Sequence, residues 1–212
     1  MNVLPKPESL EHTHSKSKEK RLTVVTGSYD GWIMLWNTEE KLWSVSTEVN
    51  QKYPINRLAI SEDGAILAVA ATDGVFVYRL EPDVKFLTRV EEKSNVTSIF
   101  FQLQPNLFYY TTEGGDLLCY DVAQQAKSLV FSNGVDINCA ELSPNQSEVY
   151  FGDSYGNVKV IEVRQQTLKN SMCGNKNTSI RSLAISPICS LLAAGDSLGE
   201  LYWWSLSEAS VS

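Results

Sequence analysis

The sequence predicts an all-β fold made of a repeated four-stranded unit, because three kinds of landmark recur with one period. Five turn glycines lie 43, 41, 41 and 43 residues apart, at Gly31, Gly74, Gly115, Gly156 and Gly199. Large apolar residues close the following strands at steps of 42, 42, 41 and 43, at Trp36, Tyr78, Tyr120, Ile161 and Trp204. Segments with apolar residues at i, i+3 and i+5 begin at Ile55, Val96, Ile137 and Ile180. A period of about 40 to 45 residues is typical of one propeller blade per repeat. The sequence therefore predicts a β-propeller, which holds partners rather than housing a single catalytic cleft.

The best-defined repeat, residues 137–163, divides into three short strands separated by turns. Pro144 presets φ in the first turn, and Gly156 can adopt a positive φ in the second. Four more polar segments are predicted to form the fourth, outer strand of successive blades, as expected of an edge: residues 41–49, 85–90, 127–131 and 166–172. No segment has a helical period, so the blades are expected to be four-stranded and antiparallel.

Composition and charge divide the chain into three parts. Residues 1–21 are polar, contain two prolines and lack the apolar centre of a signal peptide, so a disordered tail is predicted there. Residues 22–206 carry the blades, and residues 207–212 form a short C-terminal tail. The chain has a net charge of −7, and residues 22–212 hold 13 basic and 22 acidic residues, net −9. An acidic body argues against nucleic-acid binding, which needs clustered Lys and Arg.

No apolar run approaches the 18 residues of a membrane span, and the expected location is the cytoplasm. The four cysteines, Cys119, Cys139, Cys173 and Cys189, have no close pair of the kind that zinc sites use, so reduced thiols are expected. The only histidines, His12 and His14, could be interpreted as a metal pair, but two ligands in a polar tail do not make a site. No metal or cofactor is predicted.

A hydrolase is the enzymatic alternative, because two segments match the G-x-S-x-G motif around Ser154 and Ser197. Such a nucleophile elbow needs a strand-to-helix turn and a downstream histidine. The chain has neither, and both motifs fall at the repeat position that reads GSYDG in residues 27–31. Turn chemistry explains all three segments, so no enzymatic activity is predicted.

Four aromatic residues are candidate partner-binding positions. Tyr29 and Tyr155 fall within turns, where an exposed ring could anchor a partner or could lie over its own turn. Trp32 and Trp203 are out of phase with the predicted packing residues and could face outward. Each of these readings stays open at the level of the sequence.

The repeat pattern resembles WD repeats, and in detail the chain resembles the propeller subunit that accompanies the TOR kinase, the G-protein β-subunit-like family. Residues 137–153 are most similar, through Ile-Asn-Cys, then Pro-Asn-Gln, then Gly-Asp before the tight turn. Residues 27–30 and 77–80 are also similar, and the likeness extends from about Arg21 to Leu206. The resemblance implies a WD40-type propeller that acts as a scaffold, binding the kinase of TOR complexes TORC1 and TORC2 in nutrient and growth signalling.

Two departures from the family qualify this expectation. Only Tyr120-Asp121 comes near the Trp-Asp ending, and no Gly-His pair exists, so blade stability is expected to depend mainly on packing. The family is seven-bladed, whereas this chain supplies about five repeats. The first repeat lacks its inner strand and the last stops after its third, so an incomplete propeller is predicted. The alternative function is a WD-repeat module that binds peptides in an unrelated assembly.

Overall fold

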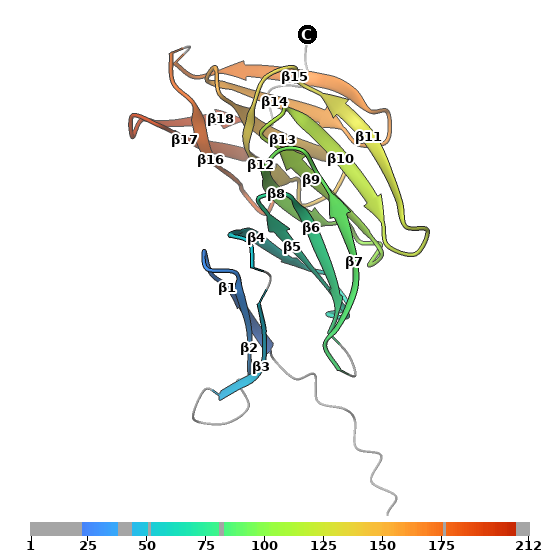
Figure 1. Ribbon diagram of the computed structural model, residues 1–212. Helices are drawn as coiled ribbons and strands as arrows, with labels where there is room; N and C mark the ends of the chain where they lie inside the picture. The colour runs from blue at the N-terminus through green and yellow to red at the C-terminus, as the bar shows by residue number, and fades with distance from the viewer. Residues whose placement is uncertain (1–22, 38–43, 51, 81–82, 176, 207–212) are drawn as a thin grey trace, which may run out of the picture.

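The computed structural model describes residues 23–37, 44–50, 52–80, 83–175 and 177–206. These residues form eighteen β-strands and no helix. The strands make five separate antiparallel sheets, each built from consecutive strands in the order of the chain (Figure 1). The predicted all-β class and the predicted blades are therefore confirmed. The predicted tails, residues 1–21 and 207–212, lie outside the described residues, as do His12 and His14.

Each sheet is one blade, and the strands have the following bounds. Blade 1 contains β1 (Thr23–Gly27), β2 (Trp32–Asn37) and β3 (Ser44–Asn50). Blade 2 contains β4 (Ile55–Ile60), β5 (Ile66–Ala71), β6 (Gly74–Arg79) and β7 (Lys85–Glu91). Blade 3 contains β8 (Val96–Phe101), β9 (Leu107–Thr112), β10 (Asp116–Asp121) and β11 (Ala126–Ser132). Blade 4 contains β12 (Ile137–Leu142), β13 (Glu148–Asp153), β14 (Asn157–Glu162) and β15 (Thr167–Cys173). Blade 5 contains β16 (Ile180–Ile185), β17 (Leu191–Asp196) and β18 (Leu201–Ser205).

The two end blades differ from the middle ones as the sequence predicts. In the described residues, blade 1 has no strand in the place of the inner strands β4, β8, β12 and β16, and blade 5 has none in the place of the outer strands β7, β11 and β15. Consecutive inner strands contact one another. Figure 1 shows the blades following one another along an open, curved row from blue blade 1 to red blade 5, with the end blades apart.

The recurring turn glycine is required by backbone geometry, as Gly156 illustrates. Its φ is +81°, a conformation that L side chains rarely adopt, and a Cβ there would lie 2.1 Å from the carbonyl oxygen of Asn175. Asn175 belongs to the loop that leads to the next blade, so the turn and the loop pack backbone against backbone. At Gly31, Gly115 and Gly156 the repeated glycine thus marks the place where a blade meets the loop that leaves it.

The core lies between the blades. Four clusters of buried apolar side chains are found among the described residues, and each cluster joins two consecutive blades. At the junction of blades 2 and 3, for example, Val75 and Val77 pack with Phe108 and Tyr110. Blades 2, 3 and 4 are covered on both faces in this way, which agrees with the expectation that stability depends on packing.

Candidate partner-binding surface

One end of every blade is built from a tight hairpin turn and the loop that leads to the next blade, and we call this end of the molecule the turn face. Backbone hydrogen bonds tie the two together. In blade 4, Ser154 N donates to Asp136 O at 3.1 Å and Gly174 N donates to Gly156 O at 2.9 Å. Equivalent pairs recur in the other blades, such as Asn133 N to Gly115 O at 2.7 Å. The turn face is therefore held rigidly by main-chain contacts.

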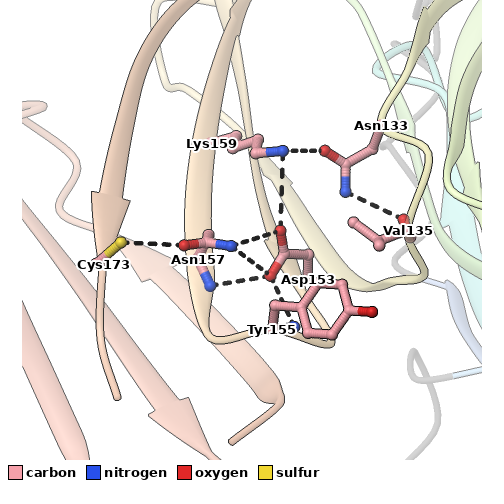
Figure 2. A network of polar contacts seen from close by, with 7 residues as sticks. All are labelled: Asn133, Val135, Asp153, Tyr155, Asn157, Lys159 and Cys173. Carbon is pink, nitrogen blue, oxygen red and sulfur yellow. Dashed lines mark hydrogen bonds and ion pairs between the residues drawn. The ribbon is translucent and has the colours of Figure 1, made fainter. Parts of the chain in front are cut away.

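A buried aspartate organises the turn of blade 4, and Figure 2 shows its contacts. Asp153 is fully buried, and its Oδ1 accepts hydrogen bonds from the backbone N of Tyr155 and of Asn157, both at 2.9 Å. The Asn157 side-chain amide also donates to Asp153 Oδ2, at 3.1 Å, and Lys159 Nζ lies 3.9 Å from the same oxygen. Lys159 in turn donates to Asn133 in the preceding loop. Lys159 thus compensates the charge of the Asp153 carboxylate, and N–H groups of the protein occupy its acceptor sites. The role of Asp153 is to hold the turn in place.

Blade 5 repeats this arrangement with a different donor. Asp196 accepts from the backbone N of Leu198 and of Glu200, each at 2.9 Å, and Tyr202 Oη donates to Asp196 Oδ2 at 3.0 Å. Tyr202 takes the repeat position of Lys159, because the hairpins of the two blades have the same register. In two neighbouring turns of the turn face, therefore, an aspartate holds the turn by accepting hydrogen bonds from two backbone N–H groups.

The predicted turn tyrosines are both solvent-exposed on this face. Tyr29 is 82% exposed and Tyr155 is 60% exposed. Only the backbone of Tyr155 takes part in the Asp153 network, so its ring is free of that network (Figure 2). Trp32 begins β2 beside the turn of blade 1 and is 36% exposed. The structure places Tyr29 and Trp32 at one end of the row of blades and Tyr155 three blades further on.

A group of residues that sequence reasoning missed extends the surface beside blade 1. Tyr53 is 37% exposed, and its backbone closes around Gly31 in the turn of blade 1. The Arg89 guanidinium lies over the rings of Tyr53 and Phe76, 5.3 and 5.2 Å from their centroids, and pairs with Asp73. The Tyr53 ring is thereby held in place, and its backbone lies against the turn of blade 1. Sequence alone carried no signal for it, because Tyr53 lies in a loop outside the repeat landmarks.

The turn face also carries Leu198, which is 72% exposed in the turn of blade 5. Leu198 occupies the repeat position of Tyr155, one residue before the turn glycine, so the period could have identified it. Trp203, by contrast, lies away from the turn face: it is 75% exposed on the flat side of blade 5. The four predicted positions therefore divide between two surfaces.

The two G-x-S-x-G motifs form hairpin turns between strands, at β13 to β14 and at β17 to β18. A nucleophile elbow joins a strand to a helix, so neither serine has that geometry. The flanking carboxylates of Asp153 and Asp196 are occupied by backbone N–H groups of their own turns. The motifs are explained by turn formation.

The remaining predicted features concern thiols, metals and membranes. All four cysteines are free, with Cys119 and Cys139 buried in strands and Cys173 exposed. Within the described ranges, no group of three or more His, Cys, Asp or Glu side chains is placed to hold a metal ion. A search of the same residues finds no helix with the length and apolarity needed to cross a membrane.

Comparisons with known proteins agree with the fold and with the resemblance. No protein-family profile matches the chain. The chain is 28% identical over 190 residues to the protein LST8 homolog of Drosophila pseudoobscura pseudoobscura, covering 88% of this chain and 60% of that protein. It is 25% identical over 188 residues to the target of rapamycin complex subunit LST8 of Saccharomyces cerevisiae, covering 86% of this chain and 61% of the subunit.

A solved structure, that of Sqt1 from Chaetomium thermophilum, is similar in fold, with a TM-score of 0.73 at 21% identity over 88% of this chain and 54% of Sqt1. The chain spans about 60% of the length of the curated relatives that it matches. The predicted resemblance is confirmed: this chain has the WD40-type blade fold, and the curated relatives that it matches include proteins named as LST8 homologs and as target of rapamycin complex subunits LST8.

Proposed function

We propose that this chain is a non-catalytic scaffold that binds a TOR-type kinase and supports TOR complexes in nutrient and growth signalling. The observation that carries this proposal is the similarity, along 86% of the chain, to a protein named as a target of rapamycin complex subunit. That similarity extends over far more than one repeat. The proposed location is the cytoplasm, which is what the resemblance to a TOR complex subunit implies.

The turn face is the proposed contact surface for the kinase. Tyr29 and Tyr155 project from turns that backbone hydrogen bonds hold rigid, so little conformational freedom is lost when a partner covers their rings. Tyrosine combines apolar area with a hydroxyl that can still bond, which suits an interface residue. Tyr53, fixed by Arg89, adds a third ring next to the turn of blade 1.

Co-purification of the chain with a TOR-type kinase tests the proposal. We expect the kinase to be recovered with the wild-type chain, and recovery to fall at least tenfold with the double variant Tyr29→Ala and Tyr155→Ala. Leu129→Ala is the matched control, because Leu129 is an apolar residue, 55% exposed, on outer strand β11 rather than on the turn face.

Three outcomes would count against the proposal or a part of it. If a full-length LST8 relative captures the kinase under conditions in which this chain does not, the kinase-binding role is lost. If the chain instead captures an assembly without a TOR-type kinase, the peptide-binding alternative replaces it. Equal loss with the double variant and with Leu129→Ala would remove the turn face as the contact surface.

A further inference from the structure

A groove lies between blades 2 and 3, at the end of the molecule opposite the turn face. It has a volume of about 420 Å³ and lies where β6 ends and where β10 turns into β11. Its lining includes Arg79, Leu87 and Thr88 of blade 2, and Asn106, Val122 and Gln125 of blade 3. We call it the blade 2–3 groove. All four strands of both blades are described, so the groove belongs to the interior of the row of blades.

The strand register places two basic side chains on the face of blade 2 that meets blade 3. Ile66, Arg79 and Lys85 pair in one row across β5, β6 and β7. Side chains of directly paired residues lie on the same face of a sheet, and Ile66 packs in the cluster that joins blades 2 and 3. Arg79 and Lys85 therefore lie on that face too. Like charges directly opposite each other destabilise a sheet, so this pair favours an anion beside it.

No described acidic side chain pairs with these two cations. The ion pairs among the described residues join other side chains, and neither Arg79 nor Lys85 takes part in one. Asp121 is close to the groove in sequence, but it pairs with Leu107, which packs toward blade 4. Its carboxylate therefore belongs to the opposite face of blade 3, and its Oδ1 accepts from the backbone N of Ala123 at 2.8 Å. The positive charge stays uncompensated, although residues 22–212 carry a net charge of −9.

Two substitutions within the repeat distinguish this junction from the next one. The residues at the repeat position of Arg79, defined by the strand registers, are otherwise acidic or neutral: Asn37, Asp121, Glu162 and Ser205. Ala123, which also lines the groove, is equivalent to Arg164 of blade 4, because the backbone hydrogen bonds of the two hairpins correspond. At the junction of blades 3 and 4 the two positions are thus an acid and an arginine. In the blade 2–3 groove they are a cation and a small residue, which leaves room for an anion from outside.

The rest of the lining suits a peptide. The side chains of Thr88, Asn106 and Gln125 form no hydrogen bond with described residues, and together they offer donors and acceptors. Leu87 and Val122 add partly buried apolar surface. The volume lies within the range of about 300 to 1,000 Å³ that is usual for ligand sites. A peptide with a carboxylate next to an apolar side chain can use all three kinds of group at once.

We propose that the blade 2–3 groove binds an acidic peptide segment of a partner protein. A glutamate or aspartate carboxylate pairs with the Arg79 guanidinium, whose fork of N–H donors matches a carboxylate. An adjacent apolar side chain packs on Leu87 and Val122, and the peptide backbone bonds with Asn106 and Gln125. Because the groove is opposite the turn face, the proposal does not rest on the kinase-binding role.

Two matched peptides test the assignment. The first is leucine–glutamate–leucine, acetylated and amidated at its ends, and in the second glutamine replaces glutamate. Titrated into the ¹⁵N-labelled chain, the glutamate peptide should shift the amide resonances of Thr88, Asn106, Val122 and Gln125, with a dissociation constant of about 1 mM. The glutamine peptide should bind at least fivefold more weakly, because it lacks the charge that strengthens hydrogen bonds with Arg79.

Variants assign this preference to the groove. In the double variant Arg79→Gln and Lys85→Gln, the two peptides should bind equally. Both side chains lack an ion-pair partner among the described residues, so the variant should fold as wild type does. The control is Lys93→Gln with Arg164→Gln, which removes the same charge at exposed residues outside the groove and should keep the preference. Ala123→Glu places a carboxylate beside Arg79 and should weaken binding of the glutamate peptide at least fivefold.

Several results overturn the proposal. One is the absence of any shift at about 10 mM peptide, well above the expected dissociation constant. Equal binding of the two peptides to wild type is another, and so is a preference that survives in the Arg79→Gln and Lys85→Gln variant when circular dichroism shows it folded. Inorganic phosphate is the third probe: if it binds at the same resonances as tightly as the glutamate peptide does, the groove is a simple anion site and the peptide assignment is wrong.

Discussion

The hydroxyl of Tyr110 donates a hydrogen bond of 2.5 Å to the carboxylate of Glu92, and this contact links blade 3 to the loop that leaves blade 2. Tyr110 is fully buried. Glu92 also accepts from Lys127 Nζ at 2.9 Å, so its charge is compensated on a third element. This polar contact therefore lies at the edge of the otherwise apolar junction between blades 2 and 3.

Tyr110→Phe is expected to destabilise the fold by about 1 to 2 kcal/mol, because it removes one hydrogen bond to a charged acceptor and leaves the ring in place. Glu92 keeps its contact with Lys127, which limits the loss. The measurement is urea unfolding followed by circular dichroism. Tyr29→Phe is the control, since Tyr29 is 82% exposed and the variant should unfold like wild type. An unchanged midpoint for Tyr110→Phe would show that the contact contributes nothing.

The buried tyrosines make stability fall at alkaline pH. Burial raises the pKa of Tyr78 to about 12 from its ordinary 10, and burial together with the Glu92 hydrogen bond raises the pKa of Tyr110. A raised pKa means that the unfolded state loses its proton first, so the contribution of these tyrosines to the free energy of unfolding is constant well below pH 10 and decreases as pH rises from 10 toward 12. Urea midpoints measured between pH 8 and 11 should show this decrease. Tyr78→Phe should reduce its slope, and an identical slope in the variant would contradict the assignment.

The thiols are expected to react in a fixed order. Burial raises the pKa of Cys119 and of Cys139 to about 11, so both are protonated and covered at neutral pH. Cys173 is exposed on outer strand β15. Iodoacetamide at pH 7.5 should therefore label Cys173 in the native protein, and label Cys119 and Cys139 only after denaturant is added. Peptide mass spectrometry distinguishes the sites, and early labelling of Cys139 would show that the junction of blades 4 and 5 opens readily.

Two glycines offer a matched test of the turn geometry. Gly156 and Gly134 both have a positive φ, +81° and +72°, but a Cβ at Gly134 would meet nothing within 4 Å. Gly134→Ala should therefore cost only the conformational penalty of about 1 kcal/mol. Gly156→Ala adds a clash with the carbonyl of Asn175 and should cost at least about 2 kcal/mol more. Equal costs, measured by urea unfolding, would mean that the loop moves aside freely.

The repeat period predicted the blades well because it is set by backbone geometry. Gly31, Gly115 and Gly156 lie where a hairpin turn meets the loop that leaves the blade, and Gly156 has no room for a side chain. Two of the in-phase residues that close strands, Tyr78 and Tyr120, are buried between blades. It could not predict Arg89 stacked on Tyr53 and Phe76, nor Tyr110 bonded to Glu92, because these contacts join residues 13 to 36 positions apart that share no repeat position.

Trp36 and Trp204 show that the burial of a residue depends on the sheets next to it and not only on its position in the repeat. Both occupy the repeat position at which Tyr78, Tyr120 and Ile161 are at most 5% exposed, yet both are only partly buried. Trp36 lies on the side of blade 1 that faces away from blade 2, and Trp204 belongs to a blade with no described outer strand beside it. A sequence pattern identifies which residues suit a junction, but their burial depends on whether a second sheet is present.

The end blades are expected to exchange their amide hydrogens fastest, because they are supported on one face only. Apolar clusters cover blade 4 on both faces, whereas blades 1 and 5 each take part in a single cluster. Repeat arrays draw much of their stability from contacts between neighbours, so local opening should begin at the ends. At low micromolar concentration, hydrogen exchange should be slow in residues 137–163 and fast in residues 23–37 and 180–206. Uniform protection with a single cooperative melt in a monomer would contradict this gradient and would indicate that the end blades are stable without a partner.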